Sequence, residues 1–317
     1  MVTIFFDIQC LFSQIKMEIN NRVMNTENNS TNLDFKVSVV MPVYNAEKYV
    51  EEAVQSAVQL DEVGEIILIE DGSKDGSLQV CEKLAKAYDK ITLLVHENNA
   101  NRGASASRNL GIQMAKFSYV SFLDADDIYA EHRFSNDVTI FLSKPEIDGV
   151  YSAVGYINEP DGKKFTLTKT IPPRQLFHYL LRGTYGHFHT NGITVKTSVF
   201  KDIGYFNPKL RLHQDTEMWL KMAFKNTLIG GELVKTVASI RRHEGNRIWK
   251  GQNNDTRLLV YQSFLDWVIQ KNISNFDLLI LVKKIARFQS KLSKSSCLVV
   301  FFKKAVQAMI IKHFKAR

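Results

Sequence analysis

Short apolar runs alternate with amphipathic stretches from about residue 37 to residue 130. Four apolar runs are predicted to be strands: Val37 to Val43, Glu65 to Ile69, Thr92 to Val95 and Tyr119 to Leu123. The three stretches between them are predicted to be helices. Strands and helices that alternate in this way are typical of βαβ units with right-handed crossovers. The first half is therefore predicted to be Rossmann-like α/β, with a mostly parallel sheet flanked by helices.

The alternation ends after residue 150, which predicts a second half of mixed structure. Its expected elements are a turn at Glu159 to Gly162, a helix opened by Pro172 and Pro173, a strand around Gly192, a helix from Asp215 to Lys225 and a strand-like run from Leu228 to Ile240.

Both ends of the chain differ from this body. Residues 1–35 have no clear period, and the polar stretch Asn25 to Asn32 reads as a linker, so that Met17 or Met24 is an alternative start. Residues 251–317 are predicted to form a helix from Asn254 to Lys271 and two apolar helices. The predicted organisation is an extension (1–35), a catalytic-type domain (36–250, with halves 36–130 and 131–250) and a C-terminal helical region (251–317).

The net charge of +8 is concentrated at the C-terminal end. Residues 283–317 contain ten Lys or Arg and no Asp or Glu, which leaves 31 basic and 33 acidic residues in the rest. A body that is close to neutral is not that of a nucleic-acid-binding protein. The scattered Cys10, Cys81 and Cys297 argue against a disulfide framework or a zinc site and favour a reducing cytosol. We expect no signal peptide and no membrane-spanning segment.

The basic C-terminal segment has the composition of a helix that lies in a membrane interface. Lys304, Lys312 and Lys315 fall on one helical face, and the apolar surface is predicted to come from Leu298, Phe301, Phe302, Met309, Ile310 and Phe314. Because acidic residues are missing, anionic lipid is the favoured partner, and we expect peripheral attachment to the cytoplasmic face of the inner membrane. Core packing and an oligomer contact are the alternatives.

A polar cluster follows each predicted strand of the first half. These clusters are Tyr44 and Asn45, Glu70 to Ser73, Asn98 to Arg102, and Asp124 to Asp127. Ligands of an open parallel sheet bind at the carboxyl ends of its strands, where all four clusters are expected to meet.

The last cluster, Asp124 to Asp127, is named the acidic run here. Asp124 and Asp126 are hard oxygen ligands for Mg²⁺ or Mn²⁺, cations that bind through one or two carboxylates and substrate phosphates. The acidic run therefore predicts a diphosphate-bearing substrate, and capping of a helix after Asp127 is the alternative.

Four segments resemble, in order and spacing, the motifs of family 2 glycosyltransferases with the GT-A fold: VSVVMPVYNAEKYVEEAVQS, EIILIEDGSKDGS, NRGASASRNLGI and YVSFLDADD. The resemblance covers roughly residues 36–248. It implies an inverting transfer of a sugar from a nucleotide-diphosphate donor, with UDP-sugar as first candidate, to a glycan or lipid-linked acceptor in cell-surface polysaccharide biosynthesis.

The resemblance also implies roles for individual residues. Pro42, Tyr44, Asn45 and Asp71 inherit contacts to the base and ribose, and Glu70 departs from the Asp that is usual in the family. Arg102, Asp124 and Ala125 are expected to line the nucleotide-sugar pocket. Asp126 is the expected ligand of a divalent cation (Mn²⁺ or Mg²⁺), with Asp124 in support and Asp127 capping the next helix.

The second half is expected to supply the general base. In HQDTEMWLKMAF, Asp215 begins a predicted helix, at the place of a family ED-type motif that reads Gln214 and Asp215 here. An inverting transfer needs a carboxylate that takes the proton of the acceptor hydroxyl, and Asp215 is that candidate, with a plain helix cap as the alternative.

Further polar residues of the second half are candidates for diphosphate or acceptor contacts: Asn191, Gly192, Arg242, His243, Asn246 and Arg247. Arg242 and His243 resemble the family's R-x-H segment. His187 and His189 alternate on one face of a probable strand, which suits the lining of an acceptor site better than a zinc pair.

Other function classes fit less well. A dinucleotide oxidoreductase needs a GxGxxG loop, and PVYNAEKYV contains no glycine. A nucleotidyltransferase would carry a Gly-rich basic loop after the first strand. A non-catalytic nucleotide-sugar or glycan-binding protein of the same fold stays open.

Overall fold

The computed structural model describes residues 35–157, 164–243, 254–293 and 296–315. The predicted extension and linker, the turn at 159–162, Asn246, Arg247 and the boundary at residue 250 lie outside these residues. The predicted division into domains therefore stays a prediction.

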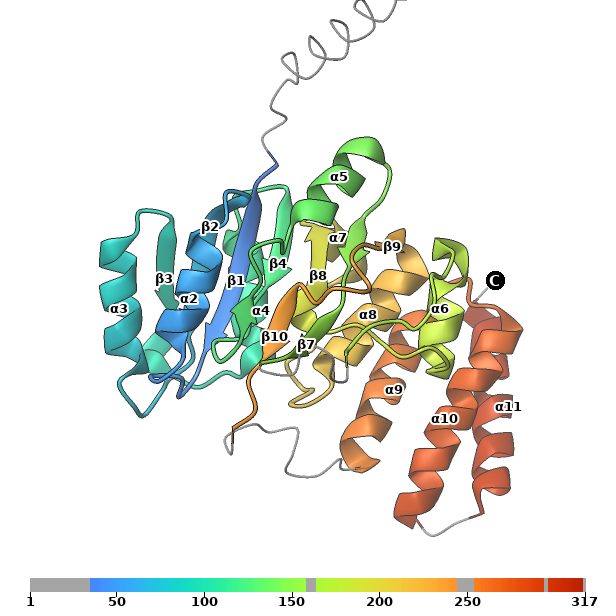
Figure 1. Cartoon of the computed structure of the whole chain (residues 1–317). Helices are drawn as coiled ribbons and strands as arrows, with labels where there is room; N and C mark the ends of the chain where they lie inside the picture. The colour runs from blue at the N-terminus through green and yellow to red at the C-terminus, as the bar shows by residue number, and fades with distance from the viewer. Residues whose placement is uncertain (1–34, 158–163, 244–253, 294–295, 316–317) are drawn as a thin grey trace, which may run out of the picture. The chain divides into compact units, whose positions relative to one another are not determined.

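A seven-stranded sheet forms the centre of the fold (Figure 1). Its strands, in spatial order, are β3 (Ile91–Val95), β2 (Val63–Glu70), β1 (Val37–Val43), β4 (Tyr119–Phe122), β8 (Ile193–Lys196), β6 (Gly149–Tyr151) and β9 (Leu228–Gly230). The first four are mutually parallel, and β8 is antiparallel to both of its neighbours. The predicted parallel first half and mixed second half are both confirmed.

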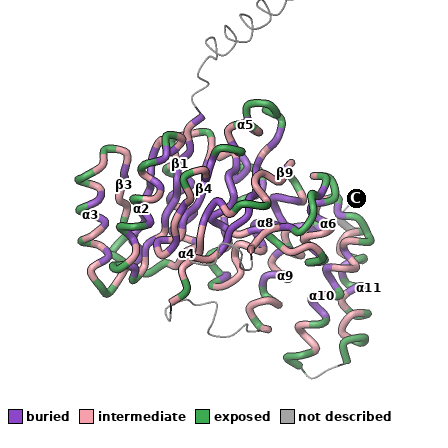
Figure 2. Tube along the Cα trace, viewed as in Figure 1, coloured by how far each residue is buried: buried purple, intermediate pink, exposed green. Residues whose placement is uncertain are grey.

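The central strands are almost continuously apolar because both faces of the sheet are covered. Figure 2 shows the buried segments running through them. Their covering helices are α2 (Val50–Val58), α3 (Ser77–Ala87) and α4 (Ala104–Met114). Right-handed crossovers put α2 and α3 on one face and α4 on the other (Figure 1). Helix α4 lies so close to the sheet that a Cβ at Gly111 would come within 2.4 Å of Val40 Cγ1.

A second sheet of three short strands lies beyond the acidic run. It consists of β5 (Ile128–Tyr129), β10 (Ala238–Ile240) and β7 (Val154–Tyr156), with β10 in the centre. The predicted single strand-like run from Leu228 to Ile240 is therefore wrong. It forms β9 and β10, which belong to different sheets, because the chain leaves the large sheet after Gly230.

Helices complete the second half and the C-terminal region. They are α5 (Ser135–Ser143), α6 (Pro173–Arg182), α7 (Val199–Ile203), α8 (Gln214–Lys225), α9 (Asn254–Val268), α10 (Asn275–Ser293) and α11 (Cys297–Lys315), with 3₁₀ turns η1 (Glu97–Asn99) and η2 (Thr190–Gly192). Ser263 of α9 donates to Glu217 of α8, and His178 of α6 pairs with Asp277 of α10 at 2.7 Å. The C-terminal helices therefore pack on the half that carries Asp215. Among the described helices, none is both long and apolar enough to cross a membrane.

Candidate functional site

The loops after β1 and β2 are tied together by side chains at the carboxyl edge of the sheet. Asn45, which has a φ of 50°, accepts a hydrogen bond from the Lys74 N–H through its side chain, and its own N–H donates to Ser73 Oγ. Pro42 and Tyr44, beside it, are half-buried. The predicted nucleotide-contacting residues of β1 therefore stand at the edge where the polar clusters meet.

The carboxylates of Glu70 and Asp71 are buried and hold loops in place. Glu70 accepts from the N–H groups of Gly72 and Ser73 in the turn that follows it. Asp71 accepts from the N–H groups of Arg102 and Gly103 at 2.7 and 2.9 Å. Asp71 thus fastens the loop after β3 to the end of β2, and the Arg102 side chain is left exposed beside it.

Each carboxylate of the acidic run has a polar partner from a different element. Asp124 pairs with Arg108 of α4 at 2.6 Å, and Asp126 accepts from His243 Nε2 at 2.8 Å. Asp127 is buried, and it accepts from Asn191 Nδ2 and from the N–H of Arg241. Ala125 is buried between them.

Strand pairing explains why partners so distant in sequence meet here. In the antiparallel pair β4–β8, Ser121 lies opposite Thr194, so Asp124 after β4 arrives beside Asn191 before β8. In the antiparallel pair β5–β10, Ile128 lies opposite Ser239, so the residues after β10 arrive beside the residues before β5. The two pairings bring Asn191 and His243 to the acidic run from either side.

The predicted role of Asp127 as a helix cap is wrong. The chain continues from Asp127 as strand β5, and the next helix, α5, begins only at Ser135. Because both oxygens of Asp127 are used by Asn191 and Arg241, this residue joins the acidic run to the second half.

Burial and mutual repulsion shape the charge of the acidic run. Burial, and then the charge of Asp124, raises the pKa of Asp126, against the lowering effect of the His243 hydrogen bond. The pKa of Asp127 is raised well above its usual value by burial and by the charges of Asp126 and Asp124. Repulsion of this kind is relieved by a cation, which places positive charge among the carboxylates.

The residues present fit a hard divalent cation. The side chains of Asp124 and Asp126 are 31% and 28% exposed, so both can be reached from solvent, and both offer oxygen ligands. No group of three or more His, Cys, Asp or Glu side chains that could hold a metal occurs in the described part of the chain. A cation there would complete its shell with substrate phosphates and water.

Asp215 belongs to the second half of the chain. It lies in the first turn of α8, which confirms the predicted start of that helix. Burial lowers the pKa of His189, whereas the charges of both Asp124 and Asp215 raise it, and Arg108 lowers it further. A direct contact between the two halves at the acidic run is made by Asn191, which hydrogen-bonds to Asp124 and Asp127.

A cavity of about 110 Å³ lies beside the start of α8. It is lined by Asn101, Arg102, Gly103, Ala104, Ser105, Pro208, Leu210, Arg211 and Gln214. The cavity lies between the loop that Asp71 holds and the first residue of α8. Arg102 and Gln214, the neighbour of Asp215, thus line the same cavity.

Other predicted residues are placed differently. Arg242 stacks on Tyr156, with its Cζ 3.8 Å from the ring centroid, and it is the neighbouring Arg241 that contacts Asp126 O and Asp127. His187 and His189 do not lie on a strand. His189 precedes η2 and its Nδ1 accepts from the Asn191 N–H. Gly192 is buried in η2, beside Asn191.

Arg108 ends the segment Arg102 to Arg108, which by its resemblance is expected to line the nucleotide-sugar pocket, but its pairing with Asp124 was not predicted. It is buried, and its Nε and Nη1 have no hydrogen-bond partner within the described residues. Its only sequence signal is a lone basic residue among small ones in GASASRN. The choice between Arg102 and Arg108 as the partner of Asp124 needs the packing of α4.

Curated relatives of this chain include proteins described as glycosyltransferases. A protein described as an uncharacterized glycosyltransferase of Rickettsia felis is 30% identical over 235 residues, 72% of this chain and 38% of that protein. The minor teichoic acid biosynthesis protein GgaB of Bacillus subtilis is 29% identical over 60% of this chain and 21% of its own length. The chain thus spans well under half the length of these curated relatives.

The fold is shared with a solved structure. Residues 1–349 of S. aureus TarS, in complex with UDP-GlcNAc, align with a TM-score of 0.61 and 20% identity over 80% of this chain and 72% of that one.

A family model for glycosyl transferase family 2 matches residues 38–204, more than half of the chain. The resemblance noted in the sequence motifs is confirmed: this chain belongs to glycosyl transferase family 2.

Proposed function

We propose that the protein transfers a sugar, with inversion, from a nucleotide-diphosphate donor to a glycan or lipid-linked acceptor. The observation that carries the proposal is geometric: Asn191 of the second half hydrogen-bonds to Asp124 and Asp127, and the cavity beside the loop that Asp71 holds is lined by both Arg102 and Gln214. We assign donor binding to the acidic run and proton abstraction to Asp215, so that the two act on opposite sides of the reacting bond.

Donor binding is assigned to the edge formed by β1, β2 and β4. Pro42, Tyr44 and Asn45 contact the base, and the loop that Asp71 holds borders the ribose. Asp126 and Asp124 hold a divalent cation, Mn²⁺ or Mg²⁺. When bound, such a cation supplies charge neutralisation at the diphosphate. The unpaired donors of buried Arg108 add positive charge beside Asp124.

Asp215 is assigned the role of general base. The acceptor oxygen attacks the anomeric carbon as its proton passes to Asp215, and the bond from that carbon to the nucleoside diphosphate breaks on the opposite face. The electron pair of the broken bond leaves on the diphosphate. No covalent enzyme intermediate forms in this single displacement, which inverts the anomeric centre.

UDP-N-acetylglucosamine is the first donor to test, and a cell-surface polysaccharide is the first acceptor class. The complex of TarS with UDP-GlcNAc and the teichoic acid role in the name of GgaB support these choices. We propose that the acceptor is glycan or lipid-linked and that the transfer takes place at the cytoplasmic face of the membrane.

A donor panel tests the proposed function. UDP-, GDP- and TDP-sugars are incubated with the protein and Mn²⁺, and free nucleoside diphosphate is measured with and without polysaccharide acceptor. We expect UDP release from a UDP-sugar that rises with acceptor and stops with EDTA. Binding of a donor without any turnover would instead identify a non-catalytic sugar-nucleotide-binding protein.

The proposal extends to a membrane contact through α11. Its exposed face carries large apolar side chains at Leu298, Val299, Phe302, Val306, Met309 and Ile310, while Ala305 and Ala308 face the protein. Exposed Lys303 lies beside that face, and residues 283–317 contain no acid. An apolar face beside an exposed lysine, on a segment without acidic residues, matches an anionic bilayer.

Two predicted contributors to this face are corrected. Phe301 is half-buried and packs against the core. The ammonium group of Lys312 donates to Ile273 O and Asn275 Oδ1, so it is occupied within the protein. The side chains of Phe314 and Lys315 lie outside the described part.

Replacing both Phe302 and Ile310 by serine should weaken binding to vesicles that contain phosphatidylglycerol by at least about tenfold, because two large apolar side chains no longer enter the interface. Co-sedimentation measures the binding. The matched control is Leu142→Ser on α5, since Leu142 is 48% exposed and Phe302 57%. Unchanged vesicle binding, or a loss of dimer instead of a loss of lipid binding, would contradict the membrane contact.

A further inference from the structure

We infer that Arg133 is a positioning residue, which sets the geometry of the acidic run through Asn191. The consequence of this inference, an effect on cation and donor binding, rests on the proposed function. The link itself is a set of hydrogen bonds in the protein without ligands. Neither Arg133 nor its partner Asp137 belongs to the motifs that carry the family resemblance.

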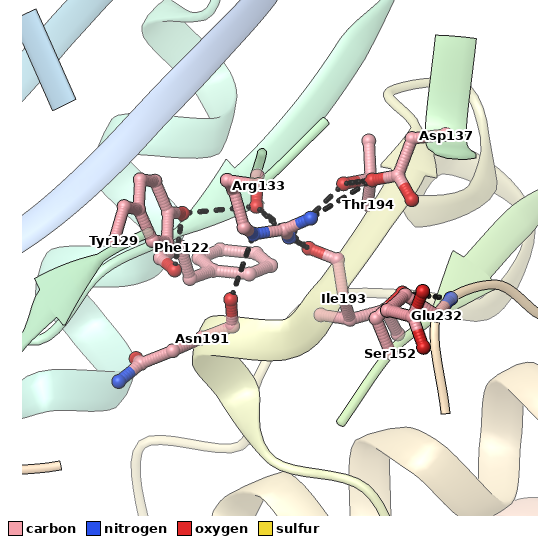
Figure 3. Close-up of polar contacts among 10 residues, drawn as sticks. Phe122, Tyr129, Arg133, Asp137, Ser152, Asn191, Ile193, Thr194 and Glu232 are labelled. Carbon is pink, nitrogen blue, oxygen red and sulfur yellow. Dashed lines mark hydrogen bonds and ion pairs between the residues drawn. The ribbon is translucent and has the colours of Figure 1, made fainter. Parts of the chain in front are cut away.

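Arg133 is a buried cation with every nitrogen in use. Its side chain is 0% exposed and pairs with Asp137 at 2.9 Å, one helical turn away. Its guanidinium also packs over the rings of Tyr129 and Phe134. Nη2 donates to three oxygens: Ser121 Oγ, Ile193 O and Thr194 Oγ1 (Figure 3).

The remaining donor of Arg133 reaches the loop that carries Asn191. Nε donates to Asn191 O at 3.0 Å (Figure 3). The side chain of Asn191 is fully buried and contacts the acidic run at two points. Its Oδ1 accepts from the Asp124 N–H at 3.2 Å, and its Nδ2 donates to Asp127 Oδ2 at 2.6 Å. A continuous chain of hydrogen bonds therefore runs from Arg133 to both ends of the acidic run.

The position of this chain explains why a charge is kept in the core. A buried ion pair adds little stability compared with apolar side chains of the same size, so packing alone does not account for it. A guanidinium has five donors in a fixed plane and can hold β4, β8, α5 and η2 at once. A Leu or Met could fill the space without fixing the direction of the Asn191 carbonyl.

Because Arg133 is closed off from solvent, it cannot touch donor, acceptor or cation. Its effect passes through Asn191, as with the partners that orient metal ligands from behind and whose loss weakens metal binding about 10- to 100-fold. This path predicts a selective defect: the acidic run loosens while the fold remains.

The test compares Arg133→Lys with Thr194→Val. Lysine keeps a charge opposite Asp137, but its single nitrogen cannot also hold the Asn191 carbonyl. Thr194→Val removes hydrogen bonds to Asp137 and Arg133 in the same cluster and leaves the Asn191 link intact. Amide hydrogen exchange at Asp124 and Mn²⁺ affinity in the presence of UDP are measured for both variants, with thermal melting alongside.

We expect exchange at the Asp124 amide to rise about tenfold in Arg133→Lys and Mn²⁺ affinity to fall by a similar factor. Thr194→Val should lower the melting temperature and leave the Asp124 exchange rate and the Mn²⁺ affinity unchanged. In an Asn191→Ala background, Arg133→Lys should change Mn²⁺ affinity less than about twofold, because the link is already cut.

Unchanged exchange at Asp124 in Arg133→Lys overturns the inference whatever the metal does. An equal effect of Thr194→Val overturns it too, since a general loosening of the cluster then accounts for the data. If exchange rises but the wild-type protein binds no Mn²⁺ with UDP, the link stands and the cation role in the proposed function fails.

Discussion

Asp215→Asn should bind the UDP-sugar donor with wild-type affinity and transfer the sugar about 10²- to 10⁴-fold more slowly, the range that a positioned general base contributes. Asparagine keeps an oxygen that can accept from the Thr216 N–H, as Asp215 Oδ1 does at 2.7 Å. It cannot take a proton from the acceptor hydroxyl. Calorimetric donor binding and a transfer assay under saturating donor separate the two effects.

The alternative to a general base is a helix cap, and Asp202→Asn is the matched control. Asp202 is an exposed carboxylate in the first turn of α7. A first-turn carboxylate stabilises a helix by about 0.3–1 kcal/mol through the helix dipole, so both variants should lose a similar, small amount of stability. Only Asp215→Asn should lose transfer. A transfer rate near wild type in that variant would rule out the assigned base.

Asp126→Asn should weaken Mn²⁺-dependent binding of UDP by at least about 100-fold. The loss of a group that only orients a metal ligand lowers metal affinity about 10- to 100-fold, and the loss of the ligand itself should cost at least as much. Asparagine is isosteric and can still accept from His243, so the ion pair's shape is retained while the charge is lost. The measurement is a titration of UDP at fixed Mn²⁺ in wild type and variant.

The control for this variant is removal of the metal. EDTA should lower UDP affinity of the wild type to the level of Asp126→Asn and should leave the variant unchanged. His243→Ala should keep Mn²⁺-dependent UDP binding better than Asp126→Asn does. If the two variants behave alike, Asp126 serves the ion pair with His243 and another group binds the cation.

The sequence by itself determined the parallel half of the fold and the edge of the sheet at which we propose that a ligand binds. Strands β1 to β4 were predicted to within a few residues, because continuous apolar runs between helices of period 3.6 are a local signal. The polar residues that end these strands follow directly from the same reading. Asp124 and Asp126 were therefore identifiable as candidates without coordinates, and Asp215 followed from the resemblance of its segment to a family motif.

Only the tertiary structure decided which partners these carboxylates have. The register of β4 against β8 brings Asn191 to Asp124, and the register of β5 against β10 brings His243 to Asp126. Neither register could be predicted from the local sequence pattern. Strands as short as β5 and β10 have too few residues to show a pattern of their own, and their position depends on the strand they pair with. The same dependence split the run from Leu228 to Ile240 between two sheets.

The physical reason is that a sequence pattern indicates which residues are buried and whether they form a helix or a strand. Which side chains form hydrogen bonds and ion pairs depends instead on their distance in space. Pattern could not tell Arg108 from Arg102, or Arg241 from Arg242, since each pair offers the same chemistry on adjacent stretches of chain. Packing of α4 against Val40 and the path of β10 made those choices. The acidic run was visible from the sequence, and the buried Arg133 behind it was visible only once the strands were paired.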